Sequence, residues 1–283
     1  MQKQVLYLVC ILFLCNSAGA TDEATQQKFT AVRQKIQDSN WRALPLGKLI
    51  AKVGLQLVDA PYVGGTLDRP GREQCTVDML RLDCVTLFEV SLNMGRIMKQ
   101  GKDSLQDLIE AVTFTRYRDG VLSDYTSRLH YTSDWIENNI QKGTVVDVTS
   151  QLGGKPFPLA LGFMSQNPKY YPALVENPQL VPVMQTIEQR VNLTSRTIIR
   201  KEDIASIEEK LQDGDIIAIA TSKKGLDYSH TGLIVREGNK ARFLHASSVK
   251  KKVMLDGPVS EYVNRAESNL GITVLRPLMP GNK

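Results

Sequence analysis

Three residues of this chain have side chains that can act together in nucleophilic catalysis. Cys84 stands at the start of an apolar run, and His230 and His245 stand on either side of the dipeptide Gly238-Asn239. A thiol becomes a strong nucleophile when a base takes its proton, and a third group must orient that base. We therefore predict that Cys84 is a nucleophile, His230 its general base and His245 the residue that orients the base.

The spacing of the two histidines predicts that they share one face of a hairpin. Gly238-Asn239 favours a tight turn between two strands. With that turn, His230 faces Ser247 and His245 faces Gly232, so the imidazoles are diagonal neighbours with room beside Gly232. A slip of one residue would separate them, and both could then be surface histidines without a catalytic role.

Cys84 is predicted to open a buried helix over residues 84–98, with Asp83 as its N-cap. The helix dipole and the free N–H groups of the first turn would then lower the pKa of the thiol. A cysteine in an apolar helix can also be an inert part of the core. Cys75 offers another alternative, a disulfide bridge with Cys84, if the chain reaches an oxidising compartment.

The first 20 residues predict such a destination. Lys3 precedes an apolar run from Val5 to Cys15, and small residues from Ser17 to Ala20 follow it. This is the pattern of a secretory signal peptide cut after Ala20, although a buried N-terminal helix is the alternative. We therefore expect an exported protein, periplasmic or secreted.

The composition excludes several classes of protein. The chain has 283 residues, 42% of them hydrophobic and 23% charged, as in ordinary globular proteins. A formal net charge of +5, without a dense basic stripe, argues against nucleic acid as a ligand. Beyond the signal peptide, no stretch reaches the roughly 18–20 apolar residues of a membrane span. We expect a monomer that needs no metal or other cofactor and does not enter a membrane after signal cleavage.

Hydrophobic periodicity predicts helices first and an antiparallel sheet afterwards, which is an α+β layout. We expect one domain over residues 21–283, helical over about 21–210 and sheet-forming over about 211–283. The expected helices cover residues 22–38, 46–57, 84–98, 104–120, 134–141, 178–191 and 260–266. The expected strands cover residues 215–220, 230–236, 242–247 and 271–276, and residues 249–255 extend or bend the third. Residues 150–175 are expected to form an irregular surface segment.

Four motifs carry a resemblance to a known superfamily. They are Leu82-Asp83-Cys84-Val85-Thr86, Gly214-Asp215-Ile216-Ile217, Ser229-His230-Thr231-Gly232 and Leu244-His245-Ala246-Ser247-Ser248. In that order they resemble the NlpC/P60 cysteine peptidases. The resemblance implies a papain-like core, with a cysteine at a helix start, a histidine on the following sheet and a polar orienting residue on the next strand.

Three further segments are similar to the DUF1460 group, the N-acetylmuramoyl-L-alanine amidase-like proteins. They are Pro61 to Leu67, Arg128 to Ile136 and Gly225 to His230. The resemblance covers roughly residues 45–277. It implies that the substrate is a soluble peptidoglycan fragment, a muropeptide, cut at the amide between N-acetylmuramic acid and L-Ala.

Aromatic side chains can stack on sugars, and arginine can bind carboxylates. On that basis the predicted substrate-binding residues are Tyr62, Asp83, Arg116, Arg128, His130, Tyr131, Trp135 and Asp227. The simpler alternatives are that Trp135 anchors the core, that Arg116 lies at a solvated helix end and that Asp83 only caps its helix. Asp227 is also the second choice for the residue that orients the base.

Two other functions are compatible with the same residues. One is an endopeptidase that cuts within the peptide stem. The other is an exported protein that binds muropeptides without turning them over. The products formed from a defined muropeptide distinguish all three.

Overall fold

The computed structural model describes residues 22–281. The predicted signal peptide lies outside the described residues. The helices are α1 (Glu23–Asp38), α2 (Leu46–Leu55), α3 (Cys84–Lys99), α4 (Leu105–Arg116), α5 (Thr132–Gln141), α6 (Phe163–Gln166), α7 (Pro172–Glu176), α8 (Leu180–Asn192), α9 (Ile204–Ile207) and α10 (Val259–Val263). The strands are β1 (Val145–Asp147), β2 (Lys155–Phe157), β3 (Arg196–Arg200), β4 (Ile216–Thr221), β5 (Tyr228–Glu237), β6 (Lys240–Ser247), β7 (Lys252–Pro258) and β8 (Asn269–Pro277).

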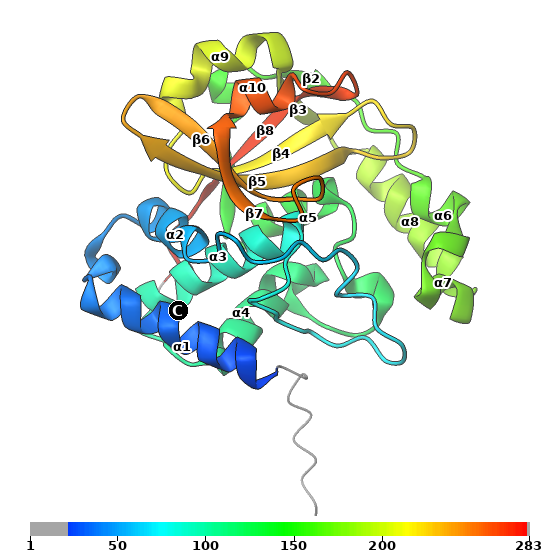
Figure 1. Cartoon of the computed structure of the whole chain (residues 1–283). Helices are drawn as coiled ribbons and strands as arrows, with labels where there is room; N and C mark the ends of the chain where they lie inside the picture. Colours follow the sequence, from blue (N-terminus) through cyan, green and yellow to red (C-terminus); the bar gives the residue numbers. More distant parts are fainter. Residues whose placement is uncertain (1–21, 282–283) are drawn as a thin grey trace, which may run out of the picture.

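These strands join one antiparallel sheet. Its order is β2-β3-β8-β4-β5-β6-β7, and β1 pairs with β8. Helices α2 and α3 lie on one side of the sheet, α9 and α10 on the other, and α6 to α8 at one end (Figure 1). This arrangement confirms the predicted combination of helices with an antiparallel sheet. Among the described residues, no helix is long and apolar enough to cross a membrane.

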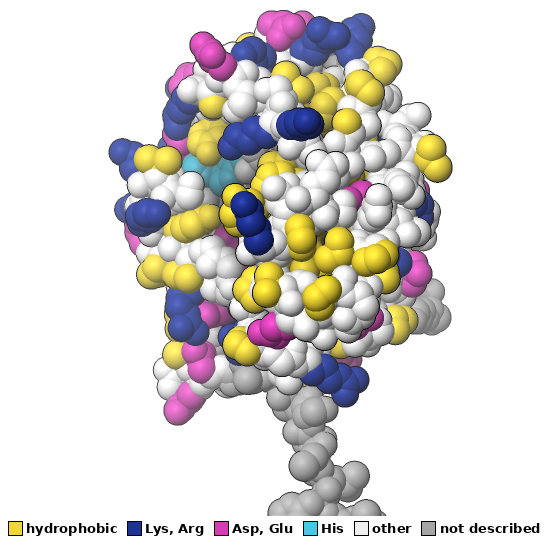
Figure 2. Space-filling model, turned by 90° about the vertical axis from the view of Figure 1, so that its right-hand side faces the viewer, with side chains coloured by type: hydrophobic (Ala, Val, Ile, Leu, Met, Phe, Trp, Pro, Cys, Tyr) yellow, Lys and Arg dark blue, Asp and Glu magenta, His cyan; other side chains and the backbone are white. Residues whose placement is uncertain are grey.

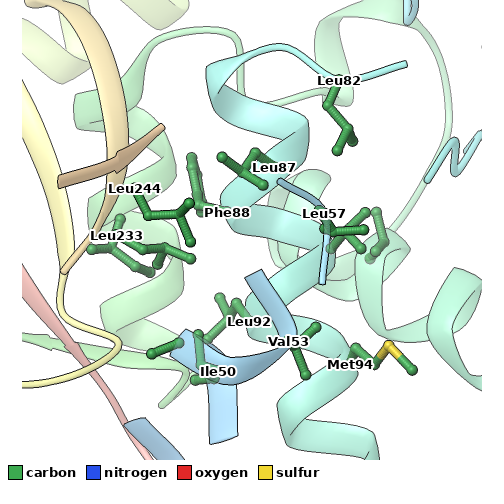
Figure 3. Packing of buried hydrophobic residues seen from close by; sticks show 14 of the residues in the cluster. Ile50, Val53, Leu57, Leu82, Leu87, Phe88, Leu92, Met94, Leu233 and Leu244 are labelled. Carbon is green, nitrogen blue, oxygen red and sulfur yellow. The ribbon is translucent and has the colours of Figure 1, made fainter. Parts of the chain in front are cut away.

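The sheet is covered on both faces, which explains why β4 is buried along its whole length. Alternate residues of β4 belong to different apolar clusters, Ala218 to the cluster around α3 and Ile219 to the cluster around α9 and α10. Figure 3 shows the first cluster, in which Leu87 and Leu92 of α3 lie among side chains of α2 and of the sheet. The helix that begins with Cys84 is therefore held rigidly against the sheet.

Local sequence determines where α3 begins. The side chain of Asp83 accepts hydrogen bonds from the backbone N–H groups of Val85 and Thr86, and the Thr86 hydroxyl accepts one from the Asp83 N–H. This reciprocal capping box stabilises a helix start by satisfying N–H groups that have no partner within the helix. The prediction of Asp83 as N-cap is confirmed.

Three parts of the fold differ from the sequence prediction. β1, β2 and β3 lie before residue 211, in the part expected to be helical, and short strands such as these show little alternation. Residues 150–175 contain α6 and α7, and Leu161, Met164 and Leu174 pack with α8 in a separate apolar cluster. Residues 252–258 form a separate strand, β7, which pairs with β6.

Candidate active site

Cys84 is the first residue of α3. The Asp83 side chain accepts hydrogen bonds from the N–H groups of Val85 and Thr86, at 3.0 and 2.8 Å. It does not bind the N–H group of Cys84. A free N–H at a helix N-terminus points away from the helix body and favours negative charge. The Cys84 N–H can therefore stabilise an oxygen that becomes negative next to the thiol.

The thiol of Cys84 lies beside β5. The Thr231 hydroxyl donates a hydrogen bond of 2.9 Å to the carbonyl oxygen of Cys84. The thiol also interacts with the hydroxyl and the backbone N–H of Thr231. The start of α3 therefore lies against the start of β5, where His230 is the residue before Thr231.

The hairpin of β5 and β6 has the predicted register. Its pairs run from Glu237 opposite Lys240 to Leu233 opposite Leu244. Beyond Leu244, β6 continues to pair with β7 on its other side. At Thr231, beside Cys84, β5 is therefore no longer paired with β6.

His230 and His245 meet on one face of this hairpin. The Nε2 atom of His230 lies 2.9 Å from the Nδ1 atom of His245. Phe243 stacks on His245 with a centroid distance of 5.0 Å. The expected room beside Gly232 needs a correction, because a Cβ atom there would lie 2.5 Å from the Phe243 ring. The missing side chain of Gly232 makes room for Phe243, which in turn supports His245.

Tyr262 lies close to all three predicted catalytic residues. Its ring stacks on His230 at a centroid distance of 5.7 Å and meets the edge of His245 at 4.6 Å. Burial raises the pKa of Tyr262 to about 12, and the Cys84 thiol adds to this shift. Tyr262 thus covers the imidazole pair from the side of α10. In the sequence, Tyr262 lies inside the predicted helix over residues 260–266, and no motif there indicated a role in catalysis.

Asp256 is a second residue that sequence reasoning missed. Its Oδ2 atom lies 3.6 Å from Nε2 of His245, on the side opposite His230. Arg265 contacts both carboxylate oxygens of Asp256, and hydrogen bonding to Arg265 holds the pKa of that carboxyl well below its usual range. The pairing of β7 with β6 would have placed Asp256 near His245, but the sequence did not identify β7 as a separate strand.

The electrostatics of the site favour neutral groups. Burial lowers the pKa of His230 to about 3, and the neighbouring His245 adds to that shift. Burial also lowers the pKa of His245 to about 4, against the opposing effect of Asp256. The predicted lowering of the thiol pKa is wrong: burial, followed by the charge of Asp83, raises the pKa of Cys84 to about 11. Burial is the largest cause of this shift, and the hydrogen bonds of Thr231 oppose it.

Cys75 and Cys84 are both free thiols. Cys75 is buried, and the guanidinium of Arg116 lies 3.9 Å from its sulfur. Cys84 is partly exposed. The structure therefore does not contain the alternative disulfide between Cys75 and Cys84.

Of the predicted substrate-binding residues, Tyr62 and Asp83 lie at the site. Asp83 caps α3, and its charge acts on the Cys84 thiol. Tyr62 is half-buried and forms an isolated β-bridge with Leu82, the residue before Asp83. Burial raises the pKa of Tyr62, with Cys84 as the next contributor. Asp83 therefore acts as the cap of α3, and Tyr62 is partly exposed beside it.

Two of the predicted binding residues are instead parts of the core. Arg116 is 3% exposed, and its guanidinium binds the carboxylate of Glu89 at 2.8 and 2.9 Å and the Thr76 carbonyl at 2.7 Å. Trp135 is also 3% exposed and packs edge-on against Phe88 at 5.0 Å. Neither can contact a ligand without leaving these partners, so the simpler interpretation of Trp135 as a core anchor holds.

Arg128 lies away from the thiol and is tied to a loop. It forms ion pairs with Asp68 at 2.8 Å and Glu73 at 3.2 Å, and its guanidinium lies over the ring of Tyr125. Arg128 and Tyr125 line a cavity of about 480 Å³ whose lining includes neither Cys84 nor the two paired histidines. The residue contributes to that cavity and not to the thiol site.

The last three predicted binding residues have other partners. Nε2 of His130 lies 2.7 Å from the Tyr125 carbonyl, and burial lowers the pKa of His130 to about 3. The Tyr131 hydroxyl donates a hydrogen bond of 2.6 Å to Glu188. Asp227 accepts a hydrogen bond from the Ser133 N–H at the start of α5, at 2.7 Å. His130, Tyr131 and Asp227 therefore hold loops and helix ends in place, and Asp227 does not orient a histidine.

The surface around a histidine is mixed in character. On the face shown in Figure 2, a histidine side chain reaches the surface among hydrophobic and basic side chains. Lys and Arg on this face are interspersed with acidic and apolar groups.

A family model described as N-acetylmuramoyl-L-alanine amidase-like matches residues 52–272. The chain therefore belongs to the N-acetylmuramoyl-L-alanine amidase-like family. The matched range contains Cys84, both paired histidines and Asp256. Membership supports a peptidoglycan amidase-like function and a hydrolytic reaction.

Solved structures are similar to the chain over most of its length. An N-acetylmuramoyl-L-alanine amidase from Bacteroides uniformis is 35% identical, with a TM-score of 0.79, over 82% of this chain and 99% of its own. A putative xylanase from Bacteroides fragilis is 34% identical, with a TM-score of 0.74, over 79% and 98%. A DUF1460 protein from Legionella pneumophila, 18% identical, shares the fold with a TM-score of 0.67 over 92% and 98%. No curated protein matches the chain.

Proposed function

We propose that the protein is an exported cysteine amidase, periplasmic or secreted, that hydrolyses the amide between N-acetylmuramic acid and L-Ala in soluble muropeptides. The observation that carries the proposal is the placing of a helix-start thiol, Cys84, beside the strand that bears His230, with His245 bound to that imidazole. Thiol catalysis requires a nucleophile, a base and a group that orients the base, and these residues supply all three types. The family supplies the class of substrate.

In the proposed reaction each nitrogen of His230 has its own role. Its Nε2 atom faces His245, so Nδ1 is the nitrogen left to accept the proton of the Cys84 thiol. The thiolate attacks the lactyl carbonyl, and the backbone N–H of Cys84 stabilises the oxyanion. His230 then returns the proton to the departing amino group of L-Ala. Water, deprotonated by the same base, releases the lactyl group from the thioester.

The resting site is a neutral thiol next to a neutral imidazole. Because the pKa of Cys84 is raised to about 11 and that of His230 lowered to about 3, a resting ion pair is unfavourable. Proton transfer is therefore coupled to attack on the substrate. The transition state supplies the charge separation that the resting site disfavours.

The prediction of which bond is cut rests on the family, and Arg116, Tyr131 and Trp135 do not support it. Those side chains suggested sugar binding in the sequence, but all three are buried. Tyr62 remains a candidate for contact with the sugar or the peptide. For this reason the stem-peptide endopeptidase stays a rival that the experiment must address.

The test is to incubate the mature protein, and its Cys84→Ala variant, with a defined disaccharide-peptide muropeptide and with the same stem peptide lacking the sugar. Mass spectrometry of the products identifies the bond. We expect an intact peptide beginning with L-Ala together with the amino sugar, no turnover by Cys84→Ala, and slow turnover of the free peptide. A shortened muropeptide, or rapid cleavage of the free peptide, would assign the protein to the endopeptidases.

Binding without turnover would identify the third possibility, a protein that only binds muropeptides. Equilibrium dialysis with the intact muropeptide detects it. A Cys75→Ala variant serves as the matched control, because it removes a thiol that lies outside the site.

A further inference from the structure

We propose that Asp256 and Arg265 are positioning residues that set the hydrogen positions on His245 and, through it, on His230. This inference rests on the proposed function, because it explains how His230 is kept ready to act as a base. The four groups form a series, from Arg265 through Asp256 and His245 to His230.

The first step concerns the two nitrogens of His245. Its ring is 1% exposed, so water does not satisfy either nitrogen. Nδ1 lies 2.9 Å from His230, while Nε2 is buried and 3.6 Å from the carboxylate of Asp256. A neutral imidazole carries one hydrogen, and a carboxylate attracts an N–H group but repels a lone pair. The hydrogen of His245 therefore belongs on Nε2.

The second step concerns which nitrogen of His230 carries its hydrogen. With its hydrogen on Nε2, His245 presents an unprotonated Nδ1, which can only accept a hydrogen bond. His230 must then donate from Nε2, so its Nδ1 carries a lone pair. That lone pair is the one that the proposed reaction uses. In the opposite arrangement His230 would carry its hydrogen on Nδ1 and could not accept the thiol proton.

The third step is the role of Arg265. Its guanidinium contacts both oxygens of Asp256, and the N–H of Gly257 donates to the same carboxylate at 2.7 Å. The guanidinium of Arg265 also lies over the ring of Tyr262, 5.2 Å from the ring centroid. Arg265 thus keeps Asp256 ionised and oriented, and links it to the aromatic ring that covers the histidines.

The charged and titratable groups that face His245 come from four elements. They are His230 of β5, Asp256 of β7, Tyr262 of α10 and Arg265 of the turn that follows α10. Of these, Asp256 is the one that carries a negative charge next to Nε2. Replacing Asp256 therefore tests the inference more sharply than replacing any other neighbour.

The direct test uses heteronuclear NMR of the imidazole nitrogens, in the Cys84→Ala protein and in Cys84→Ala combined with Asp256→Asn. We expect the hydrogens on Nε2 of both His230 and His245 when Asp256 is present. In the Asp256→Asn protein we expect a mixture of the two tautomers, because an amide can accept or donate. This measurement needs no turnover, so it can fail or succeed independently of the proposed function.

The kinetic test compares Asp256→Asn with the wild-type protein on the muropeptide. We expect kcat to fall by about 10- to 100-fold, as when a residue that orients a metal-binding histidine is replaced, with little change in KM. Asp256→Glu should restore part of the rate. Asp59→Asn is the matched control, because Asp59 forms an exposed ion pair with Lys252 at the other end of β7.

Thermal unfolding shows whether each variant folds. Unchanged tautomers and an unchanged kcat in a folded Asp256→Asn protein would overturn the inference. So would a hydrogen on Nδ1 of His245 in the presence of Asp256.

Discussion

His230 and His245 share a single hydrogen bond of 2.9 Å between Nε2 and Nδ1, and burial keeps both imidazoles neutral. One ring must donate in that bond and the other must accept. The pair therefore behaves as a unit, and the loss of either member changes what the other can do.

The two histidines should differ in their importance for turnover. His230→Ala removes the base beside Cys84 and should abolish measurable activity. His245→Ala leaves the base without its orienting partner and should cost less, by about tenfold or more. Steady-state kinetics on the muropeptide measures the difference. A His245→Ala protein as active as the wild type would require another orienting residue.

The two cysteines of the described chain should also differ in their importance for turnover. Cys84→Ala should abolish turnover, whereas Cys75→Ala should keep most of it, because Cys75 is buried beside Arg116 and outside the site. Activity assays with both variants test this. Mass spectrometry of active protein, prepared without reductant, supplies the counter-test: a Cys75–Cys84 disulfide there would rule out Cys84 as the nucleophile.

Acid should destabilise the protein through its histidines. The pKa values of His130, His230 and His245 are about 3, 3 and 4 in the folded chain, against 6.5 for the unperturbed group. The unfolded chain takes up protons first as the pH falls. Stability is therefore complete above pH 6.5 and declines as the pH falls, to about pH 4 for His245 and about pH 3 for His130 and His230, by up to about 1.4 kcal/mol per pH unit for each histidine.

Urea unfolding at pH 7.5 and at pH 5.5 measures this effect. The His130→Gln variant provides the comparison, since His130 lies outside the thiol site and its pKa is lowered as strongly as that of His230. Its stability should depend less on pH than that of the wild type. The same pH dependence in both proteins would contradict the assignment of a neutral, buried His130.

Replacing Arg116 should affect stability more than substrate binding. Arg116→Met would leave the carboxylate of Glu89 buried without its partner, at a cost of about 3–5 kcal/mol. Arg118→Met is the matched control, because its partner Asp134 keeps a second ion pair with Arg190. Urea unfolding compares the two variants. A stable Arg116→Met protein with a raised KM would contradict this prediction and indicate that Arg116 binds the substrate.

Sequence analysis succeeded where local chemistry determines structure. The cap at Asp83 and the turn at Gly238-Asn239 each act over a few residues, so the start of α3 and the register of the hairpin could be predicted. The antiparallel sheet followed from the alternation of its longer strands. The short strands β1 and β2 offered no such pattern.

The surroundings of polar and aromatic residues could not be predicted in the same way. Arginine suggests a surface or a ligand, but Arg116 is buried because Glu89, 27 positions earlier, lies against it. Asp256 carried no signal because its meaning depends on the pairing of β7 with β6. Burial also reversed the expected pKa shift of Cys84, since the cost of removing water depends on the packed fold.

The position of β8 has a consequence for biosynthesis. β8 is the last of the described strands in the chain, yet it lies between β3 and β4 in the middle of the sheet. A ribosome therefore completes the other strands before the central one exists, and β4, the support of the strand that bears His230, has an open edge until then. The nascent chain therefore cannot close its sheet until synthesis has passed β8, and β3 and β4 are joined only then.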